Sequence, residues 1–303
     1  MIVEHAPAKI NLSLHVTGQR RDGYHMLDSL VGFATVADRL TLTASEADGF
    51  RVDGPFAQDL VGETDNLVLR ACALLKDRGR SRAGGRRAFS VTLEKNLPVA
   101  SGLGGGSADA AAALRMLNAA RGLGLDPQEL QRISQALGAD LPMCVTCGAA
   151  RVSGIGEIQE PVSPFPPLAA ILVNPRVEVP TPAVFRGLAD KTNPPMPPLG
   201  DCNRSPQALI DFLRLCRNDL EAPARRVAPA IGAVLAALDA DPSCRLARMS
   251  GSGATCFGLF DSASAAGRAG ERLAADNPGW WVRACRIEND PFAIGIHTRP
   301  HNK

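Results

Sequence analysis

The sequence lacks the features that mark membrane, secreted and nucleic-acid-binding proteins. No apolar run approaches the length that spans a bilayer, and the first residues, MIVEHAPAK, contain an acid and no long apolar core. The formal net charge is only +2, and no long run of like charges occurs. We therefore expect a cytoplasmic protein that neither inserts into membranes nor binds nucleic acid.

The eight cysteines lack the spacing of a metal site or of a disulfide framework. Cys144 and Cys147 form a CxxC, but no second CxxC and no paired histidines accompany it. Most of the others lie among Ala, Leu and Val, as reduced core cysteines do. We therefore expect neither structural zinc nor disulfide bonds.

The length of 303 residues suits one large or two medium domains. A proline-rich crossing from Pro161 to Pro167 is typical of a boundary, so we predict domains at residues 1–162 and 163–303. Strands and helices mix in both halves, which indicates an α/β (α+β) protein. The order strand, helix, strand, strand, helix, strand in the second half suits a ferredoxin-like sandwich.

One glycine-rich stretch, PVASGLGGGSADAAAALR at residues 98–115, has the composition of a phosphate-binding loop. It follows residues 88–94, whose β-branched and aromatic side chains predict a strand, and it leads into an alanine-rich run that favours helix. Gly102 and the three glycines at 104–106 can adopt positive φ and let backbone N–H groups approach a polyanion. The helix adds unpaired N–H groups, the positive end of its dipole and the hydroxyl of Ser107.

The sequence of this loop does not match either of the two commonest nucleotide-binding motifs. No lysine follows the glycines, as GxxxxGK would require, and the glycine spacing differs from GxGxxG. A simple tight turn between strand and helix stays an alternative, although adjacent glycines cost chain entropy that packing alone does not explain.

The segment PAKINLSLHVTG, residues 7–18, alternates apolar and polar side chains with the period of a half-buried strand. Lys9 and Asn11 consequently project from the same face. Without further information, this face is either a binding surface or a solvent-facing polar edge.

A turn signal at Asp22–Gly23 follows that strand and leads to Tyr24, the only tyrosine, and His25. A flat ring with a hydroxyl, placed beside a histidine, can stack on a planar base and form a hydrogen bond with it. The pair is therefore a candidate base-binding element.

Asp140 lies immediately beyond a predicted helix that begins at Asp126–Pro127 and ends near Gly138. The carboxyl end of a helix carries negative partial charge, which disfavours an aspartate there. We therefore expect another group to hold Asp140; a loop residue that caps the next turn is the alternative. Phosphoryl transfer to an alcohol would require such a carboxylate to accept a proton and a cation to balance the developing charge.

Other elements are expected from periodicity and capping signals. A helix should run from a cap at Asp65 to Gly79, residues 144–157 should form strands and a turn, and residues 224–241 should form one long amphipathic helix. A second glycine-rich turn, at residues 251–253, should join two strands.

Five motifs in order resemble those of the GHMP kinases, which phosphorylate small-molecule alcohols with ATP. They are PAKINLSLHVTGQRRDGYHMLDSL, PVASGLGGGSADAAAAL, LGADLPMCV, NPRVEVPTPAVF and MSGSGATCFGLF. The resemblance implies an N-terminal domain like domain 2 of ribosomal protein S5 and a ferredoxin-like C-terminal domain. The resemblance is greatest to the GHMP kinases of the non-mevalonate isoprenoid pathway, which act on the 2-hydroxyl of a cytidine-diphosphate-linked methylerythritol.

The resemblance also implies a role for each site residue. Asp140 would accept the proton of the substrate hydroxyl, with Lys9 oriented against it. The substrate would lie among Asn11, Tyr24, His25, Thr181 and Phe185, with Phe185 facing Tyr24 across the cytosine and His25 reading the base edge. The phosphates of ATP would rest on Pro98, Val99, Ala100, Ser101, Gly102, Leu103, Gly104, Gly105, Gly106, Ser107 and Ala108. Ser107 would neighbour Mg²⁺, and no carboxylate in the sequence is an evident metal ligand.

Two other functions stay open. A homoserine or mevalonate kinase would keep the glycine loop but should lack the Tyr24–His25 pair. A nucleotide-responsive regulatory protein should lack Asp140 or Lys9, and both are present. We expect a monomer or a weak homodimer.

Overall fold

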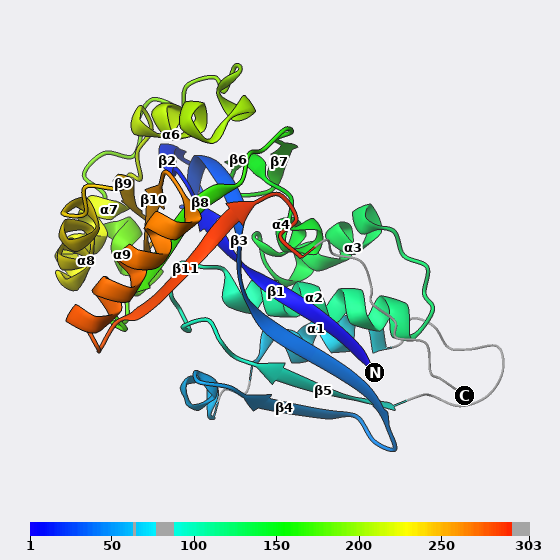
Figure 1. The fold of residues 1–303 in the computed structure, drawn as a ribbon. Coiled ribbons are helices and arrows are strands. Elements are labelled where there is room, and N and C mark those ends of the chain that lie inside the picture. The colour runs from blue at the N-terminus through cyan, green and yellow to red at the C-terminus, as the bar shows by residue number, and fades with distance from the viewer. Residues whose placement is uncertain (63–64, 77–87, 293–303) are drawn as a thin grey trace.

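The computed structural model describes residues 1–62, 65–76 and 88–292, which fold around one 11-stranded sheet. Its main path runs β4-β5-β3-β11-β8-β10-β9 (Figure 1). The strands on this path are β3 His25–Ser45, β4 Gly49–Asp53, β5 Ala88–Glu94, β8 Leu168–Asn174, β9 Cys244–Met249, β10 Cys256–Phe260 and β11 Trp281–Glu288. Off the path, β1 Ile2–Asn11, β2 His15–Gln19 and β6 Ala150–Gly154 pair with β3, and β7 Ile158–Pro161 pairs with β6.

The long strand β3 connects the two halves of the chain. It spans 21 residues, and β1, β2, β5 and β6 all form antiparallel ladders with it. Ala34 of β3 also pairs with Ile287 of β11, the last strand of the chain. The sheet is therefore continuous across the predicted boundary at residues 162–163, and the boundary itself stays a prediction.

The second half has the strand order β11-β8-β10-β9. In chain order these are its fourth, first, third and second strands, which is the order of a ferredoxin-like sheet. The helices of this half are α5 Thr181–Arg186, α6 Pro206–Arg214, α7 Glu221–Val227, α8 Ala230–Asp239 and α9 Ala263–Asp276. The predicted ferredoxin-like architecture is confirmed.

Four helices lie together beside the first half of the sheet (Figure 1). They are α1 Leu67–Lys76, α2 Gly105–Ala120, α3 Pro127–Ser134 and α4 Leu141–Thr146. α2 is buried from Ala108 to Leu117 and packs against β1, α1 and α4. Its alanine side chains are small, so this helix can approach the sheet closely enough to bury that whole length. The apolar core on this side therefore holds the glycine loop that precedes α2.

Several predicted elements are confirmed. β5 has the predicted bounds, α2 follows the glycine loop, and the helix beginning at Asp126–Pro127 has a complete capping box with Glu129. The turn at Asp22–Gly23 joins β2 to β3, and Gly23 has a φ of 92°. These are the segments in which capping, propensity and glycine signals coincide.

The single strand predicted at residues 7–18 is wrong. The chain forms β1 and β2, and between them Leu14 donates its N–H to the carbonyl of Arg217 at 2.8 Å instead of continuing the ladder. The alternative of a solvent-facing polar edge is also wrong, because Lys9 and Asn11 are buried. Alternation of side chains cannot reveal that both faces of a strand are covered.

Three other expectations need correction. Cys144 lies in α4 and not in a strand, because Pro142 in the first turn favours a helix start. The long helix predicted at 224–241 is divided into α7 and α8 at Ala228, whose extended backbone precedes Pro229. Asn66, not Asp65, caps α1 through its side-chain oxygen, which accepts the N–H of Val68 at 2.9 Å. The predicted stop at Gly79 lies outside the described residues.

All eight cysteines are free. In the part of the chain that the structure describes, no helix has both the length and the apolar character needed to cross a membrane.

Candidate active site

The glycine loop runs from Lys95 to Gly104, between β5 and α2. Gly102 and Gly104 adopt positive φ, 78° and 62°, whereas Gly105 and Gly106 are the first residues of α2. A Cβ at Gly102 would lie 2.5 Å from the carbonyl oxygen of Ser250, so this position admits only glycine. The loop therefore presents the first turn of α2, with its unpaired N–H groups, to the space beside it.

The second glycine-rich turn packs directly against this loop. The hydroxyl of Ser250 donates to the carbonyl of Gly102 at 3.1 Å, and the N–H of Thr255 donates to the carbonyl of Ser101 at 3.0 Å. The same hydroxyl accepts the N–H of Asn11 at 3.1 Å. One buried serine thus joins β1, the glycine loop and the turn between β9 and β10.

Lys9 and Asp140 form an ion pair, with Nζ 2.8 Å from Oδ2. The lysine side chain is 8% exposed, and that of Asp140 is 44% exposed. Asp140 precedes the first residue of α4 but forms no capping hydrogen bond there, so Lys9 is the group that holds it. A buried ammonium thus orients a carboxylate that still reaches solvent, which is the arrangement a proton acceptor for an incoming hydroxyl requires.

These residues line one cleft of about 540 Å³. The glycine loop, β1, the start of α4, α5 and the second glycine turn all contribute to it. Of the predicted site residues, those that line the cleft are Lys9, Asn11, Ala100, Ser101, Gly102, Gly104, Gly105, Gly106, Ser107, Asp140, Thr181 and Phe185. Residues more than one hundred positions apart in the chain therefore converge on one space.

A stacked ring pair lies beside the cleft, where Phe185, a lining residue, meets His25, which is not among the lining residues. The rings of His25 and Phe185 lie 4.8 Å apart with an interplanar angle of 26°. Tyr24 lies at the tip of the β2–β3 hairpin, is 61% exposed and is not among the residues that line the cleft. His25 is thus the ring that contacts Phe185 in the described structure, and the placement of Phe185 opposite Tyr24 across a base stays a prediction.

Hydrogen bonds fix the other side chains on this side. Asn11 donates through Nδ2 to the hydroxyl of Ser29 at 2.8 Å, and the hydroxyls of Thr181 and Ser252 lie 2.7 Å apart. Burial, together with the ammonium of Lys191, lowers the pKa of His25. The imidazole is therefore neutral at physiological pH, and its Nε2 is buried without a hydrogen-bond partner among the described residues.

The remaining loop residues lie away from the cleft. Leu103 and Ala108 are fully buried in the core, so only their backbone atoms can serve a ligand; the carbonyl of Leu103 already accepts the N–H of Lys9 at 2.8 Å. Pro98 and Val99 line a second cavity of about 160 Å³, which shares Ala100, Gly105 and Gly106 with the cleft.

Sequence reasoning missed this second cavity and its polar lining. Asn66, Lys95 and Asp109 line it together with the apolar residues Leu60, Leu67 and Val68. The available signal was that Lys95 continues the inward-facing apolar positions Phe89, Val91 and Leu93 of β5, where a buried neighbour must balance its charge. The position of that neighbour could not be predicted, because it lies 57 residues earlier in the chain.

A buried charge cluster lies beside this cavity. The ammonium of Lys95 donates to Oδ2 of Asp38 at 2.5 Å and to Oδ2 of Asp109 at 2.8 Å, and all three side chains are at most 3% exposed. Burial alone would lower the pKa of Lys95, but the two carboxylates outweigh it and raise this pKa. Lys95 is therefore an ammonium ion at any physiological pH.

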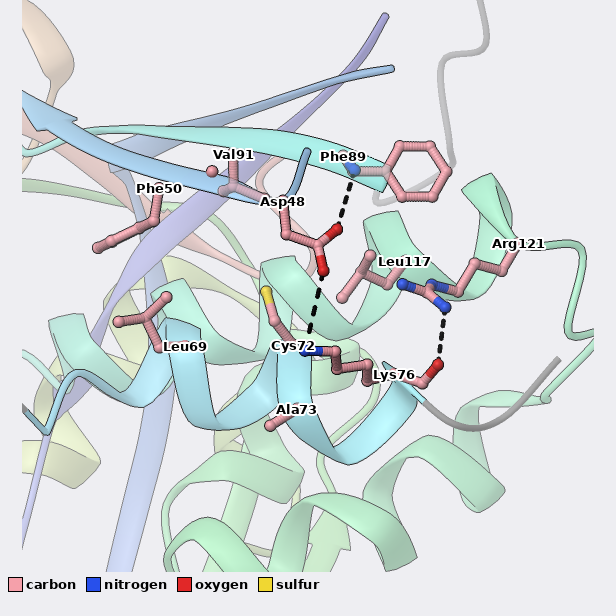
Figure 2. A pocket seen from close by; sticks show the side chains of 11 residues that line it. Asp48, Phe50, Leu69, Cys72, Ala73, Lys76, Phe89, Val91, Leu117 and Arg121 are labelled. Carbon is pink, nitrogen blue, oxygen red and sulfur yellow. Dashed lines mark hydrogen bonds and ion pairs between the residues drawn. The ribbon is translucent and has the colours of Figure 1, made fainter. Parts of the chain in front are cut away.

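A third cavity, of about 210 Å³, lies between the β4–β5 strands and helices α1 and α2 (Figure 2). Its polar groups bind one another: Asp48 accepts the N–H of Phe89 at 3.2 Å, and Arg121 donates to the carbonyl of Lys76 at 2.9 Å. Burial raises the pKa of Cys72 to about 11, which keeps this thiol protonated. The cavity shares no lining residue with the cleft, so it lies apart from the candidate site.

Metal ligands are sparse near the loop. Residues 1–62, 65–76 and 88–292 contain no group of three or more His, Cys, Asp or Glu side chains suited to a metal. Ser107 lines the cleft, whereas Asp109, also on α2, is paired with Lys95. This donor set suits a hard cation such as Mg²⁺ that is carried mainly by phosphate oxygens and water.

The comparisons with known proteins show the family of the chain. The family described as GHMP kinases N terminal domain matches residues 66–148, and the family described as GHMP kinases C terminal matches residues 202–279. The 4-diphosphocytidyl-2-C-methyl-D-erythritol kinase of Roseobacter denitrificans is 51% identical over 284 residues, which cover 93% of this chain and 92% of that protein. The protein of the same name from Dinoroseobacter shibae is 53% identical over 277 residues, or 91% and 92% of the two chains.

Solved structures extend the comparison to the fold. A 4-(cytidine 5'-diphospho)-2C-methyl-D-erythritol kinase superposes with a TM-score of 0.78 at 32% identity and covers 95% of this chain and 99% of its own. A homoserine kinase from Cytophaga hutchinsonii gives a TM-score of 0.63 at 19% identity over 95% of this chain and 94% of its own, a likeness of fold alone.

Proposed function

The chain belongs to the family of 4-diphosphocytidyl-2-C-methyl-D-erythritol kinases, and we propose that Lys9 and Asp140 carry out its reaction in the cleft described above. The enzyme is an ATP-dependent phosphotransferase of isoprenoid precursor biosynthesis. It phosphorylates the 2-hydroxyl of 4-diphosphocytidyl-2-C-methyl-D-erythritol and releases ADP. The observation that supports the residue assignment is the Lys9–Asp140 ion pair of 2.8 Å beside the first turn of α2.

The donor side is formed by the glycine loop. The N–H groups of Gly105, Gly106 and Ser107 are the unpaired donors at the start of α2, and the dipole of this helix adds positive potential there. We place the phosphates of ATP against these donors and the adenine in the adjoining cavity beside Asn66. Mg²⁺, with Ser107 as its protein neighbour, would neutralise charge on the phosphates during transfer.

The acceptor side brings the hydroxyl to Asp140. The ring of Phe185, stacked on His25, offers a flat apolar surface for the cytosine, and Asn11 and Thr181 offer polar groups nearer the loop. Asp140 accepts the hydroxyl proton as the bond to phosphorus forms, and Lys9 keeps this carboxylate in place and balances its charge. Tyr24 would contact the base only from the exposed hairpin tip. The cytoplasmic location and the monomeric or weakly dimeric state stay predictions.

The first experiment is a measurement of ADP release with Mg-ATP and 4-diphosphocytidyl-2-C-methyl-D-erythritol. Homoserine, mevalonate and galactose serve as control acceptors. Turnover with the cytidyl substrate alone is expected. Turnover with a control acceptor only would contradict the base-binding role of His25 and Phe185, and absence of turnover with all four would contradict the catalytic assignment of Asp140.

A further inference from the structure

The buried cluster of Lys95, Asp38 and Asp109 takes no part in the reaction steps above, although it lies directly behind the glycine loop. It links three elements: Asp38 lies on β3, Lys95 follows β5, and Asp109 lies on α2. Oδ1 of Asp38 also accepts the N–H groups of Asn96 at 2.5 Å and Leu97 at 2.8 Å. One carboxylate therefore fixes both the lysine and the two residues that lead into the loop.

The cluster meets the loop at Gly105. A Cβ built on Gly105 would lie 3.0 Å from Nζ of Lys95 and 3.7 Å from Oδ2 of Asp38, so it would point into the cluster and away from the cleft. Gly105 is helical and has no positive φ that would require glycine. The close approach of the ammonium is thus the reason that this position lacks a side chain.

Stability alone does not explain this arrangement. Burial of three charged groups carries a large desolvation cost, and apolar replacements of such clusters are often equally stable. An ammonium beside the amino end of a helix is also disfavoured by the helix dipole. The cluster holds two carboxylates for one ammonium, so it gives the loop a fixed geometry and not a net positive charge.

We propose that Lys95, held by Asp38 and Asp109, is a positioning residue of the phosphate site: it fixes the start of α2 beside Gly105 and, through Asp38, the residues that lead into the loop. This inference rests on the proposed binding of ATP phosphates at the loop. It deepens that proposal by assigning the placement of the loop's N–H donors to a group that contacts no phosphate in the proposed arrangement.

The test compares ATP with adenosine, which has the same base and no phosphates. In the variant Asp38→Asn/Lys95→Met, the amide oxygen of Asn can still accept the N–H groups of Asn96 and Leu97, and Met replaces the lysine stem. The two substitutions together leave the formal charge of the cluster unchanged, so an effect on ATP reports the lost geometry, and we expect the Kd for ATP in calorimetry to rise about tenfold. Lys95 also lines the cavity in which we place the adenine, so the Kd for adenosine should rise too, but by a smaller factor than that for ATP; the KM for the acceptor should stay within about twofold.

The adjacent exposed pair of Arg39 and Glu94 provides a matched control on the same two strands. Arg39→Met/Glu94→Gln should leave both dissociation constants unchanged. If the cluster variant weakened ATP and adenosine equally, or left ATP unaffected, the proposal would be overturned. If the unmutated enzyme failed to bind ATP at all, the proposed donor site itself would be wrong, so the two failures are distinguishable.

A second variant covers the case in which the double substitution does not fold. Gly105→Ala directs a methyl group at the ammonium without removing any charge. In the otherwise native protein, Gly105→Ala should raise the Kd for ATP. In the Asp38→Asn/Lys95→Met protein, provided that it folds, the same substitution should raise this Kd by a smaller factor. An adenosine affinity reduced as much as that for ATP by Gly105→Ala would contradict a role directed at the phosphates.

Discussion

At the scale of single residues, the site depends on Lys9 being buried while Asp140 is partly exposed. The lysine is enclosed and the carboxylate reaches solvent, so the pair can hold its geometry while Asp140 meets a substrate.

Asp140→Asn keeps the size of the side chain and removes its basicity. We expect kcat to fall by about 10²- to 10⁴-fold, the usual contribution of a general base, with the Kd for ATP nearly unchanged. Single-turnover kinetics and calorimetry measure the two quantities, and Asp201→Asn at an exposed ion pair is the control. Equal losses in both would indicate a structural role for Asp140.

The stacked pair leads to a second prediction at this scale. Because Phe185 contacts the ring of His25 and Tyr24 is exposed at the hairpin tip, Phe185→Ala should raise the acceptor KM about tenfold through loss of stacking. Tyr24→Phe should change the acceptor KM by at most about threefold, which is the effect of losing one exposed hydrogen bond. Steady-state kinetics at saturating ATP measures both. A larger effect of Tyr24→Phe would indicate that Tyr24 contacts the base opposite Phe185.

The sequence was a good guide to residues that carry their own local signal. The glycine loop, the capping box at Asp126 and the pairing of Lys9 with Asp140 all follow from composition, caps or a stated dipole conflict, together with the family resemblance. Lys95, Asp38 and the ring contact between His25 and Phe185 depend on which strands become neighbours. Such contacts arise from topology, and no periodicity within one strand predicts them.

At the scale of elements, the segment between α6 and α7 holds the second glycine turn. Nδ2 of Asn218 donates to the carbonyls of Met249 at 2.8 Å and Gly251 at 2.9 Å, and its Oδ1 accepts the N–H of Leu220 at 2.9 Å. Asn218→Ala leaves these buried groups without that partner, so we expect the free energy of unfolding to fall by about 2–4 kcal/mol. Urea denaturation measures this change. Asn203→Ala, which removes one exposed hydrogen bond to Pro164, should cost less than about 1 kcal/mol; equal losses would contradict the assigned role.

His15 joins β2 to the proline-rich loop and to the segment after α6. Its Nε2 accepts the N–H of Arg217 at 3.2 Å, and Nδ1 lies 3.3 Å from the carbonyl oxygen of Pro194. Burial, followed by the charge of Arg217, lowers the pKa of His15 below its usual 6.5. The unfolded chain therefore binds the proton more readily than the folded one, and stability should fall as the pH decreases below about 6.5. Thermal unfolding between neutral and mildly acidic pH should show a smaller loss for His15→Gln than for the native protein; parallel slopes would exclude His15 as the cause.

At the scale of the whole molecule, the two halves share one sheet and one apolar core. β3 pairs with β11, and one core cluster contains Ile10 and Leu30 of the first half with Leu168 and Phe257 of the second. The cleft is formed by both halves, since Lys9 and the glycine loop face α5 and the second glycine turn. A boundary recognised from proline content separates segments of sequence, but it cannot show whether strands pair across it.

This continuity predicts that the halves unfold together. Both tryptophans lie at the start of β11 in the second half, so their fluorescence reports that half, whereas far-UV circular dichroism reports the whole chain. We expect the two urea transitions to coincide, because loss of β11 would expose the shared core around Ile287 and leave β3 without a partner there. ATP at about 100 times its Kd should raise the free energy of unfolding by about 2.7 kcal/mol and shift both signals equally. Separate transitions, or a shift of the dichroism signal alone, would show that the halves are independent units.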